Sequence, residues 1–157
     1  MVKVLFVCLG NICRSPMAEA MFTKLVADEN LSDQIIVDSA GTSSEEEGNH
    51  AHPGAQAELK RHGIDGSHLI SRPITTADFE SADLILTMDA SNKHNLERMA
   101  PADDRDKIHL CYDILPTKQG GDEIPDPWYD HRFDRTYRQL AETLPAWLDA
   151  IKRQNQL

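Results

Sequence analysis

Four short apolar runs alternate with longer stretches of mixed polarity along this chain. The runs lie at residues 2–7, 34–42, 82–89 and 107–113 and are rich in valine, isoleucine and leucine. Short, nearly continuous apolar runs are typical of strands that are buried on both faces of a parallel sheet. The pattern therefore predicts four parallel strands.

Between the runs, apolar side chains recur every three or four positions, as they do on the buried face of a helix. The first such stretch covers residues 15–29, where Ser15 is expected to act as the N-cap and Pro16 suits the first turn. Further helices are predicted over residues 53–63, 90–99 and 133–154.

Two features interrupt this regular pattern. Residues 117–131 contain glycines, prolines and charged side chains, and we expect a long loop there. Pro145 lies inside the last helical stretch. It is expected to kink or split that helix, because proline has no backbone N–H and its ring crowds the preceding turn.

Strands that alternate with helices indicate an α/β fold in which a four-stranded parallel sheet carries helices on both faces. A chain of 157 residues is long enough for one core, so we expect a single domain over residues 1–157. Sheets of this kind hold their sites at the carboxyl ends of the strands. In this sequence those ends bring Cys8, Ser39, Asp89 and Asp113 to one edge.

Composition narrows the choice of partners. Acidic side chains outnumber basic ones by 26 to 16, and the formal charge of −10 argues against nucleic acid as a partner. No apolar run is long enough to span a membrane and the first strand is too short for a signal peptide, so a cytoplasmic protein is expected. Three cysteines do not suggest a disulfide framework, and no cysteine–histidine spacing suggests a metal site.

The turn after the first strand reads "CLGNICRS" over residues 8–15. Successive backbone N–H groups ahead of a helix can form a nest for an anion, and Arg14 adds a planar cation suited to two phosphate oxygens. Gly10 permits close approach of the backbone, and Asn11 tolerates a left-handed conformation. Cys8 lies at the base of this turn. The pKa of a thiol falls from about 8.5 to roughly 3.5–7.5 in such surroundings, so Cys8 is expected to be a thiolate.

The spacing of one cysteine and one arginine is weak support by itself. A strand-to-helix turn that happens to bury a cysteine is the simpler interpretation. Arg14 and Asn11, however, have no packing reason to stand in such a turn, so an anion site is the favoured hypothesis.

The stretch "VCLGNICRSPMAEA" closely resembles the signature of the low-molecular-weight protein tyrosine phosphatases. The later stretches "DSAGTSS" at 38–44, "TMDASN" at 87–92 and "DPWYD" at 126–130 match further blocks of that family in order. The resemblance covers nearly the whole chain. It implies a flavodoxin-like fold of the phosphotyrosine protein phosphatase I type, with no cofactor.

The resemblance also implies a role for each motif residue. Cys8 would be the nucleophile, Arg14 the phosphate clamp and Asp126 the general acid. Ser39 would support the loop. The loop that binds phosphate would consist of Leu9, Gly10, Asn11, Ile12, Cys13 and Ser15. The implied reaction is hydrolysis of protein phosphotyrosine and of small aryl phosphates through a phosphocysteine, with phosphate or other oxyanions as competitive ligands.

Side chains around this turn bear on the substrate. Trp128 and Tyr129 are expected to line a cleft for an aromatic ring, although core packing is an equally good interpretation of Trp128. Relatives that act on phosphoarginine carry a threonine at the position of Ile12, so Ile12 favours phosphotyrosine. Glu45 stands where the family has an aromatic cleft wall. It predicts poor use of acidic peptides, unless Glu45 to Glu47 are simply a solvated loop.

Three further positions match, or nearly match, family positions near the site. The family often has a histidine three residues before an arginine, and that histidine supports the loop asparagine. Here His68 lies four residues before Arg72, so it is a candidate support for Asn11 whose spacing differs from the family's. Asp89 and Asn92 match a family block near the site, but capping of the following helix accounts for them as well.

The two remaining cysteines are read in different ways. Cys13 resembles a family cysteine that forms a reversible disulfide with the nucleophile, although a small buried residue explains it equally well. Cys111 is expected to lie in the fourth strand and to be part of the core.

Three other functions compete with the phosphatase hypothesis. An arsenate reductase of the same fold needs two further cysteines near residues 80–90, and the sequence has none there. A non-catalytic phosphoanion-binding module needs neither Cys8 nor Asp126. A flavodoxin-like redox carrier needs hydroxyls rather than a cysteine in its phosphate loop.

Overall fold

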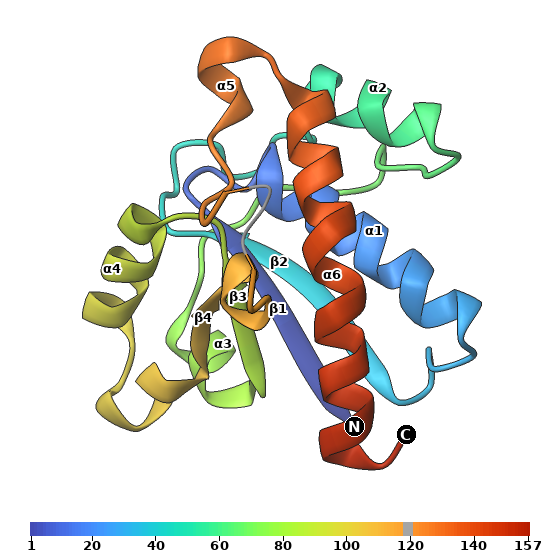
Figure 1. Ribbon diagram of the computed structural model, residues 1–157. Coiled ribbons are helices and arrows are strands. Elements are labelled where there is room, and N and C mark those ends of the chain that lie inside the picture. Colours follow the sequence, from blue (N-terminus) through green and yellow to red (C-terminus); the bar gives the residue numbers. More distant parts are fainter. Residues whose placement is uncertain (118–120) are drawn as a thin grey trace.

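A sheet of four parallel strands forms the centre of this computed structural model, which describes residues 1–117 and 121–157 (Figure 1). The strands lie in the order β2-β1-β3-β4. They span Val2–Cys8 (β1), Ile35–Gly41 (β2), Leu84–Thr87 (β3) and Ile108–Leu110 (β4). The predicted fold class is confirmed, and the strand order is the one found in flavodoxin-like sheets.

Helices cover both faces of the sheet (Figure 1). One core contains Val4 and Phe6 of β1 together with side chains of α1 (Arg14–Asp28), α2 (Pro53–Arg61) and α6 (Phe133–Asn155). The alternate residues of β1, Leu5 and Val7, belong to a second core with side chains of α3 (Thr76–Ser81) and α4 (Ala90–Met99). Because β1 is buried on both sides, its sequence shows an apolar run rather than an alternation.

The last helix continues through its proline. Helix α6 is one element from Phe133 to Asn155 with Pro145 inside it, so the expected split at Pro145 is wrong, whereas the expected kink stays a prediction. Pro145 has no N–H to donate to the Ala141 carbonyl, and both residues lie on the exposed side of the helix. The freed carbonyl can therefore bond to solvent, while Leu144 and Leu148 remain packed in the core.

Several element boundaries differ from those read in the sequence. Strand β4 ends at Leu110, and Cys111 begins a short 3-10 helix, η2 (Cys111–Ile114), so its expected place in the strand is wrong. Cys111 is nonetheless fully buried, as expected. Helix α3 and the 3-10 helix η1 (Ala102–Lys107) were not predicted. A capping box formed by Thr75 and Asp78 was the available signal for α3.

The segment expected to be a loop contains a short helix. Helix α5 covers Pro127–Asp130 and begins directly after Asp126, which is its N-cap. Residues 118–120 of the expected loop lie outside the described residues.

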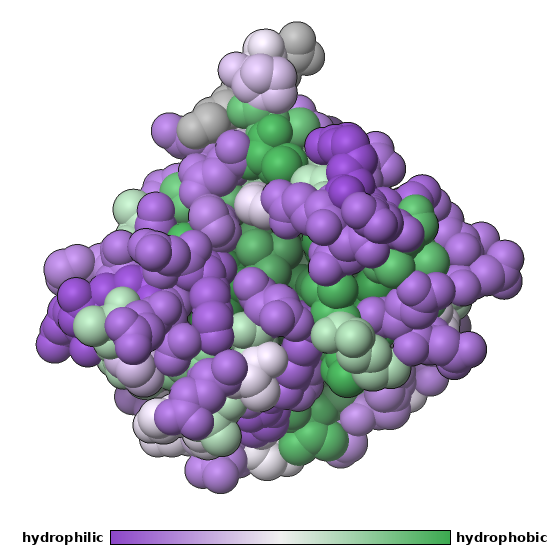
Figure 2. All heavy atoms as spheres, turned by 90° about the horizontal axis from the view of Figure 1, so that it is seen from below, coloured by the Kyte–Doolittle hydropathy of each residue, from purple (hydrophilic) through white to green (hydrophobic). Residues whose placement is uncertain are grey.

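The carboxyl ends of the strands and the two chain termini lie at opposite ends of the molecule (Figure 1). The end that carries the termini is largely hydrophilic, with hydrophobic atoms exposed between the polar ones (Figure 2). Among the described residues, no helix has the length and apolar character needed to cross a membrane. The polar turn after β1 lies at the other end, beside the loops that follow β2 and β3.

Candidate active site

The loop between β1 and α1 surrounds the side chain of Cys8. Cys8 is the last residue of β1 and only 3% exposed. Asn11 adopts a left-handed conformation, with φ of 56°, as expected for its place in the turn. Gly41 at the end of β2 lies so close that a Cβ there would be 2.8 Å from the Leu9 carbonyl oxygen. Within the described residues, the backbone N–H groups of residues 9–14 have no protein acceptor, which leaves them available to an anion.

Ser15 contacts the sulfur rather than capping the helix. Helix α1 begins at Arg14 with Cys13 as its N-cap, so the expectation that Ser15 is the cap is wrong. The Ser15 Oγ lies 3.0 Å from the Cys8 Sγ, and the Ser15 backbone N–H donates to the same sulfur at 3.4 Å. A thiolate at Cys8 would therefore accept hydrogen bonds from two groups of one buried residue.

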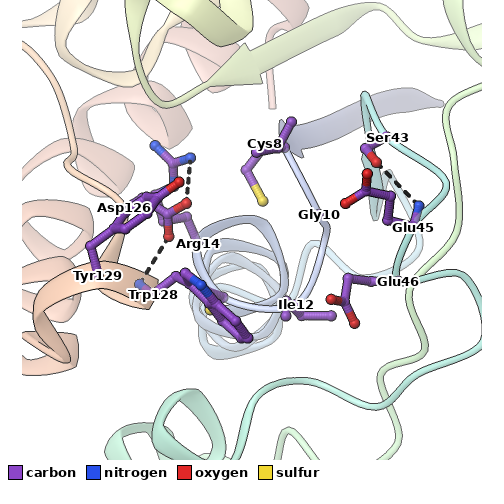
Figure 3. A pocket seen from close by; sticks show the side chains of 12 residues that line it. Cys8, Gly10, Ile12, Arg14, Ser43, Glu45, Glu46, Asp126, Trp128 and Tyr129 are labelled. Carbon is purple, nitrogen blue, oxygen red and sulfur yellow. Dashed lines mark hydrogen bonds and ion pairs between the residues drawn. The ribbon is translucent and has the colours of Figure 1, made fainter.

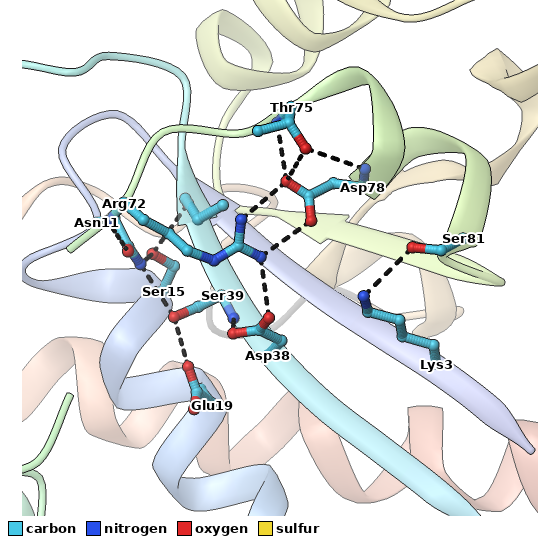
Figure 4. Close-up of polar contacts among 11 residues, drawn as sticks. Lys3, Asn11, Ser15, Glu19, Asp38, Ser39, Arg72, Thr75, Asp78 and Ser81 are labelled. Atoms are coloured by element: carbon cyan, nitrogen blue, oxygen red, sulfur yellow. Dashed lines mark hydrogen bonds and ion pairs between the residues drawn. The ribbon is translucent and has the colours of Figure 1, made fainter. Parts of the chain in front are cut away.

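The amide of Asn11 is held at both ends (Figure 4). Its Oδ1 accepts from the Arg72 backbone N–H at 3.1 Å, and its Nδ2 donates to the Ser15 Oγ at 2.7 Å and to the Ser39 Oγ at 3.0 Å. Ser39 in turn donates to Glu19 Oε1 at 2.6 Å. Burial raises the pKa of Glu19, and its hydrogen bond from Ser39 lowers it by less. The structure brings Asn11, Ser15 and Ser39 together, as the resemblance implied.

Residues from a distant loop complete this support. The Ser71 Oγ donates to the Gly10 carbonyl at 2.8 Å, and Arg72 is ion-paired with Asp38 and Asp78 (Figure 4). The hydrogen bonds that Arg72 donates to Asp78 raise the pKa of Arg72. Sequence reasoning missed Glu19, Ser71 and the backbone contact of Arg72.

His68 does not support Asn11. Its side chain is 67% exposed and lies 4.0 Å from Asp65, outside the network around the loop. Ser71 and Arg72 contact the loop instead. The prediction for His68 is therefore wrong.

Arg14 is almost completely buried beside Cys8. Its Nη1 donates to Asp89 Oδ2 at 2.7 Å and to the Ile124 carbonyl at 2.9 Å, and its Nη2 lies 3.6 Å from Asp126 Oδ2. Within the described residues its Nε has no hydrogen-bond partner. Burial lowers the pKa of Arg14, but electrostatic interaction with Cys8 and the hydrogen bond to Asp89 raise it by more, so the net shift is upward.

Asp89 has both of the roles considered for it. Its Oδ1 accepts from the Asn92 backbone N–H at 2.7 Å and caps α4, while its Oδ2 holds Arg14. Asp113, by contrast, accepts from the Leu110 backbone N–H and is not among the described residues that line the cavity above Cys8. It was expected at the same edge because the fourth strand was predicted to be longer than it is.

Asp126 lies across the cavity from the loop (Figure 3). The cavity has a volume of about 200 Å³, and Cys8, Arg14 and Asp126 all line it. Asp126 Oδ1 accepts from the Trp128 backbone N–H at 3.0 Å, which caps α5 and fixes the carboxylate from one side. The carboxyl group predicted to act as the acid is thus in the same cavity as the sulfur.

Aromatic and acidic side chains form opposite walls of the cavity (Figure 3). Trp128 is 50% exposed and Tyr129 78% exposed, so core packing is the wrong interpretation of Trp128. The indole packs edge-on against the ring of His52, with centroids 5.6 Å apart. Glu45 lies on the other wall together with Glu46, which sequence reasoning did not single out and which accepts from Asn49 Nδ2 at 2.6 Å.

The neighbouring cysteine differs from Cys8 in its surroundings. Cys13 is buried and carries a free thiol, as do Cys8 and Cys111. Burial raises the pKa of Cys13 well above its usual range, and the negative charges of Cys8 and Asp126 add to this effect. Cys13 is therefore a neutral thiol beside the sulfur of the site.

Comparisons with known proteins agree with this geometry. The family model described as low molecular weight phosphotyrosine protein phosphatase matches residues 3–157. The human protein of that name is 47% identical over 151 residues, which cover 94% of each chain. The crystal structure of YfkJ from Bacillus subtilis covers 98% of this chain and 96% of its own, with a TM-score of 0.94 and 36% identity.

A second solved structure is also similar to this chain over nearly its whole length. It is titled as a Drosophila arginine phosphatase and covers 96% of this chain and 98% of its own, with a TM-score of 0.88 and 37% identity. The match of the family model over nearly the whole chain and the identity to the human protein decide the classification. This chain belongs to the low molecular weight phosphotyrosine protein phosphatase family.

Proposed function

We propose that this protein hydrolyses phosphotyrosine in proteins, and small aryl phosphates, through a phosphocysteine at Cys8. The observation that carries the proposal is the pairing of a buried sulfur with a buried guanidinium whose Nε lacks a partner among the described residues. Unsatisfied buried donors are costly, and a phosphoryl group seated over Cys8 would satisfy both this donor and the loop amides.

In the first step, the Cys8 thiolate attacks phosphorus and the bond from phosphorus to the phenolic oxygen breaks. The equatorial oxygens keep their negative charge, facing the loop N–H groups and the Nε and Nη2 edge of Arg14. Asp126, in its protonated form, gives its proton to the leaving oxygen, because an unprotonated phenolate is a poor leaving group. The products of this step are the free phenol, a phosphocysteine and the Asp126 carboxylate.

In the second step, water attacks the phosphocysteine and the sulfur–phosphorus bond breaks. The Asp126 carboxylate takes a proton from that water, so inorganic phosphate leaves, and the Cys8 thiolate and protonated Asp126 are restored. Ser15 lies 3.0 Å from the sulfur and would stabilise the thiolate as it departs. This second step resembles the first step run in reverse, with water in place of the phenol.

Steady-state turnover of p-nitrophenyl phosphate, a phosphotyrosine peptide and a phosphoserine peptide, each with EDTA, tests the proposal. We expect turnover of the first two, none for Cys8→Ser, and a loss of orders of magnitude for Asp126→Asn. Phosphate should compete with each substrate. Full activity in either variant would remove the assignment.

Phosphoarginine is the second candidate substrate, because a solved structure 37% identical to this chain is titled as an arginine phosphatase. Ile12 lies on the cavity wall and offers no hydroxyl to a guanidinium, which supports phosphotyrosine. Hydrolysis of a phosphoarginine peptide at a rate equal to that of a phosphotyrosine peptide would reverse this preference.

The acidic wall supports a limit on the protein substrate. Glu45 and Glu46 line the cavity beside Cys8. They would repel acidic residues that flank a bound phosphotyrosine, so acidic phosphopeptides should be poorer substrates than small aryl phosphates. The difference should shrink in Glu45→Gln and at high salt, because screening weakens charge repulsion. Equal kcat/KM for both substrates at low salt would contradict this part.

We also propose that Cys13 protects Cys8 against oxidation by forming a disulfide with it. The proposal draws on their shared loop, on the free state of both thiols and on the family resemblance. Inactivation by peroxide should then be reversed by a dithiol in the wild type and not in Cys13→Ser.

Dependence on a thiolate also supports a reducing, cytoplasmic location for the protein.

A further inference from the structure

The segment before Asp126 is fastened to the turn between β3 and α4. Ile124 is fully buried; its backbone N–H donates to the Met88 carbonyl at 2.9 Å, and its carbonyl accepts from Arg14 at 2.9 Å. One residue earlier, Glu123 Oε2 accepts from the Ala90 backbone N–H at 2.6 Å. Only Pro125 separates these two anchored residues from Asp126.

The anchor at Glu123 has a clear physical basis. Ala90 is the first residue of α4, and its N–H has no acceptor within the helix. The carboxylate of Glu123 receives a charge-assisted hydrogen bond and also lies at the positive end of the helix dipole. The Glu123 carbonyl accepts from Gln139 Nε2 at 3.2 Å, so this residue joins α4 to α6.

This anchor is transmitted to Asp126 by the backbone. Pro125 fixes its own φ and restricts Ile124 to extended conformations, so little freedom remains between Glu123 and Asp126. On the other side, α5 is only four residues long, and Trp128, Tyr129 and Asp130 in it are exposed. Helix α5 is held by the buried Pro127 and by the 2.7 Å ion pair of Asp130 with Arg135, so the position of Asp126 depends on both flanking segments.

We propose that Glu123 is a positioning residue that holds Asp126 where it can protonate the leaving group. The inference rests on the proposed function, since it concerns how the acid of that reaction is placed. Without the carboxylate, Asp126 would spend less time over the leaving oxygen. The loss should then appear only where the leaving group needs a proton.

The test compares two substrates that differ in this need. Phenol has a pKa near 10, like tyrosine, whereas a nitro group stabilises the p-nitrophenolate. We expect Glu123→Ala to lower kcat/KM for phenyl phosphate about 5-fold and that for p-nitrophenyl phosphate less than about 2-fold, as for the loss of one hydrogen bond. Glu123→Gln keeps an acceptor oxygen and should recover most of the activity. Asp122→Asn removes an exposed charge from the adjacent position and should leave both values unchanged.

A double-mutant cycle separates this role from general destabilisation. If Glu123 acts through Asp126, then Glu123→Ala should cause no further loss in an Asp126→Ala background. Equal losses on the two substrates, no loss on either, or full additivity with Asp126→Ala would overturn the inference. Failure of the proposed function has a different signature, since Asp126→Ala itself would then show no dependence on the leaving group.

Discussion

Two substitutions of Asp89 can distinguish the effect of its negative charge on the site from its effect on the position of Arg14. Asp89→Ala removes the 2.7 Å hydrogen bond to Arg14 Nη1 and the N-cap of α4. Asp89→Asn removes the charge but keeps an oxygen that can cap the helix or accept from Arg14. The pair of variants therefore differs mainly in whether Arg14 stays in place.

The size of the effect follows from these contacts. A hydrogen bond to a charged group contributes about 1.5–3 kcal/mol, and an N-cap contributes about 1 kcal/mol. Asp89 is 23% exposed, which places the first contribution near the lower end. We expect Asp89→Ala to lower the free energy of unfolding by about 2.5 kcal/mol and Asp89→Asn to lower it by about 1 kcal/mol.

The two variants should have opposite effects on the binding of phosphate. Loss of a negative charge near the site favours an anion, whereas displacement of Arg14 disfavours it. The inhibition constant of phosphate should therefore rise about 10-fold in Asp89→Ala and fall or stay unchanged in Asp89→Asn. Urea unfolding and competition against p-nitrophenyl phosphate measure both quantities. Equal shifts of the inhibition constant in the same direction would refute the view that Asp89 positions Arg14.

Two further predictions concern His52, which packs against Trp128, and its neighbours Gly54 and Phe133. Gly54→Ala usually stabilises a helix, but here the new Cβ would lie 2.3 Å from the buried ring of Phe133. We therefore expect urea unfolding to show a loss of about 1–3 kcal/mol. A gain in stability would show that the ring moves freely. Burial and then the charge of His131 lower the pKa of His52, with Glu46 opposing them, and its Nδ1 accepts from the Gly54 N–H. The unfolded state therefore binds the proton more readily, and the stability that His52 contributes is present above its ordinary pKa and lost as the pH falls below it. Thermal unfolding from pH 7.5 to 5 should show a smaller loss for His52→Asn than for the wild type, and equal losses would contradict this assignment.

Residues that follow one another in the chain were the predictable part of the site. Cys8, Gly10, Asn11, Arg14 and Ser15 share one turn, so spacing and chemistry together indicated their common purpose. Asp126 could be assigned only through the family resemblance, because an aspartate before a proline is common in loops. The single domain over residues 1–157 stays a prediction.

Contacts between distant segments were not accessible in the same way. Glu19 lies on the predicted helix over residues 15–29 and looks like any helical carboxylate, and its contact with Ser39 depends on the register of two elements. Glu123 lies in a segment expected to be a loop, and nothing in the sequence pairs it with Ala90. The apolar periodicity of residues 133–154 places Pro145 off the apolar face, but the prediction gave more weight to the general effect of an internal proline, so the unbroken α6 was not foreseen.

Identification of the phosphorylated residue tests the central claim most directly. The wild type and Asp126→Ala would be mixed with an aryl phosphate, quenched in acid within milliseconds, and mapped by mass spectrometry. The account predicts a phosphoryl group on Cys8, more abundant in Asp126→Ala when the substrate is one with a good leaving group, and absent in Cys8→Ser. Turnover with no phosphorylated Cys8 at any time, or with the phosphoryl group on another residue, would contradict it.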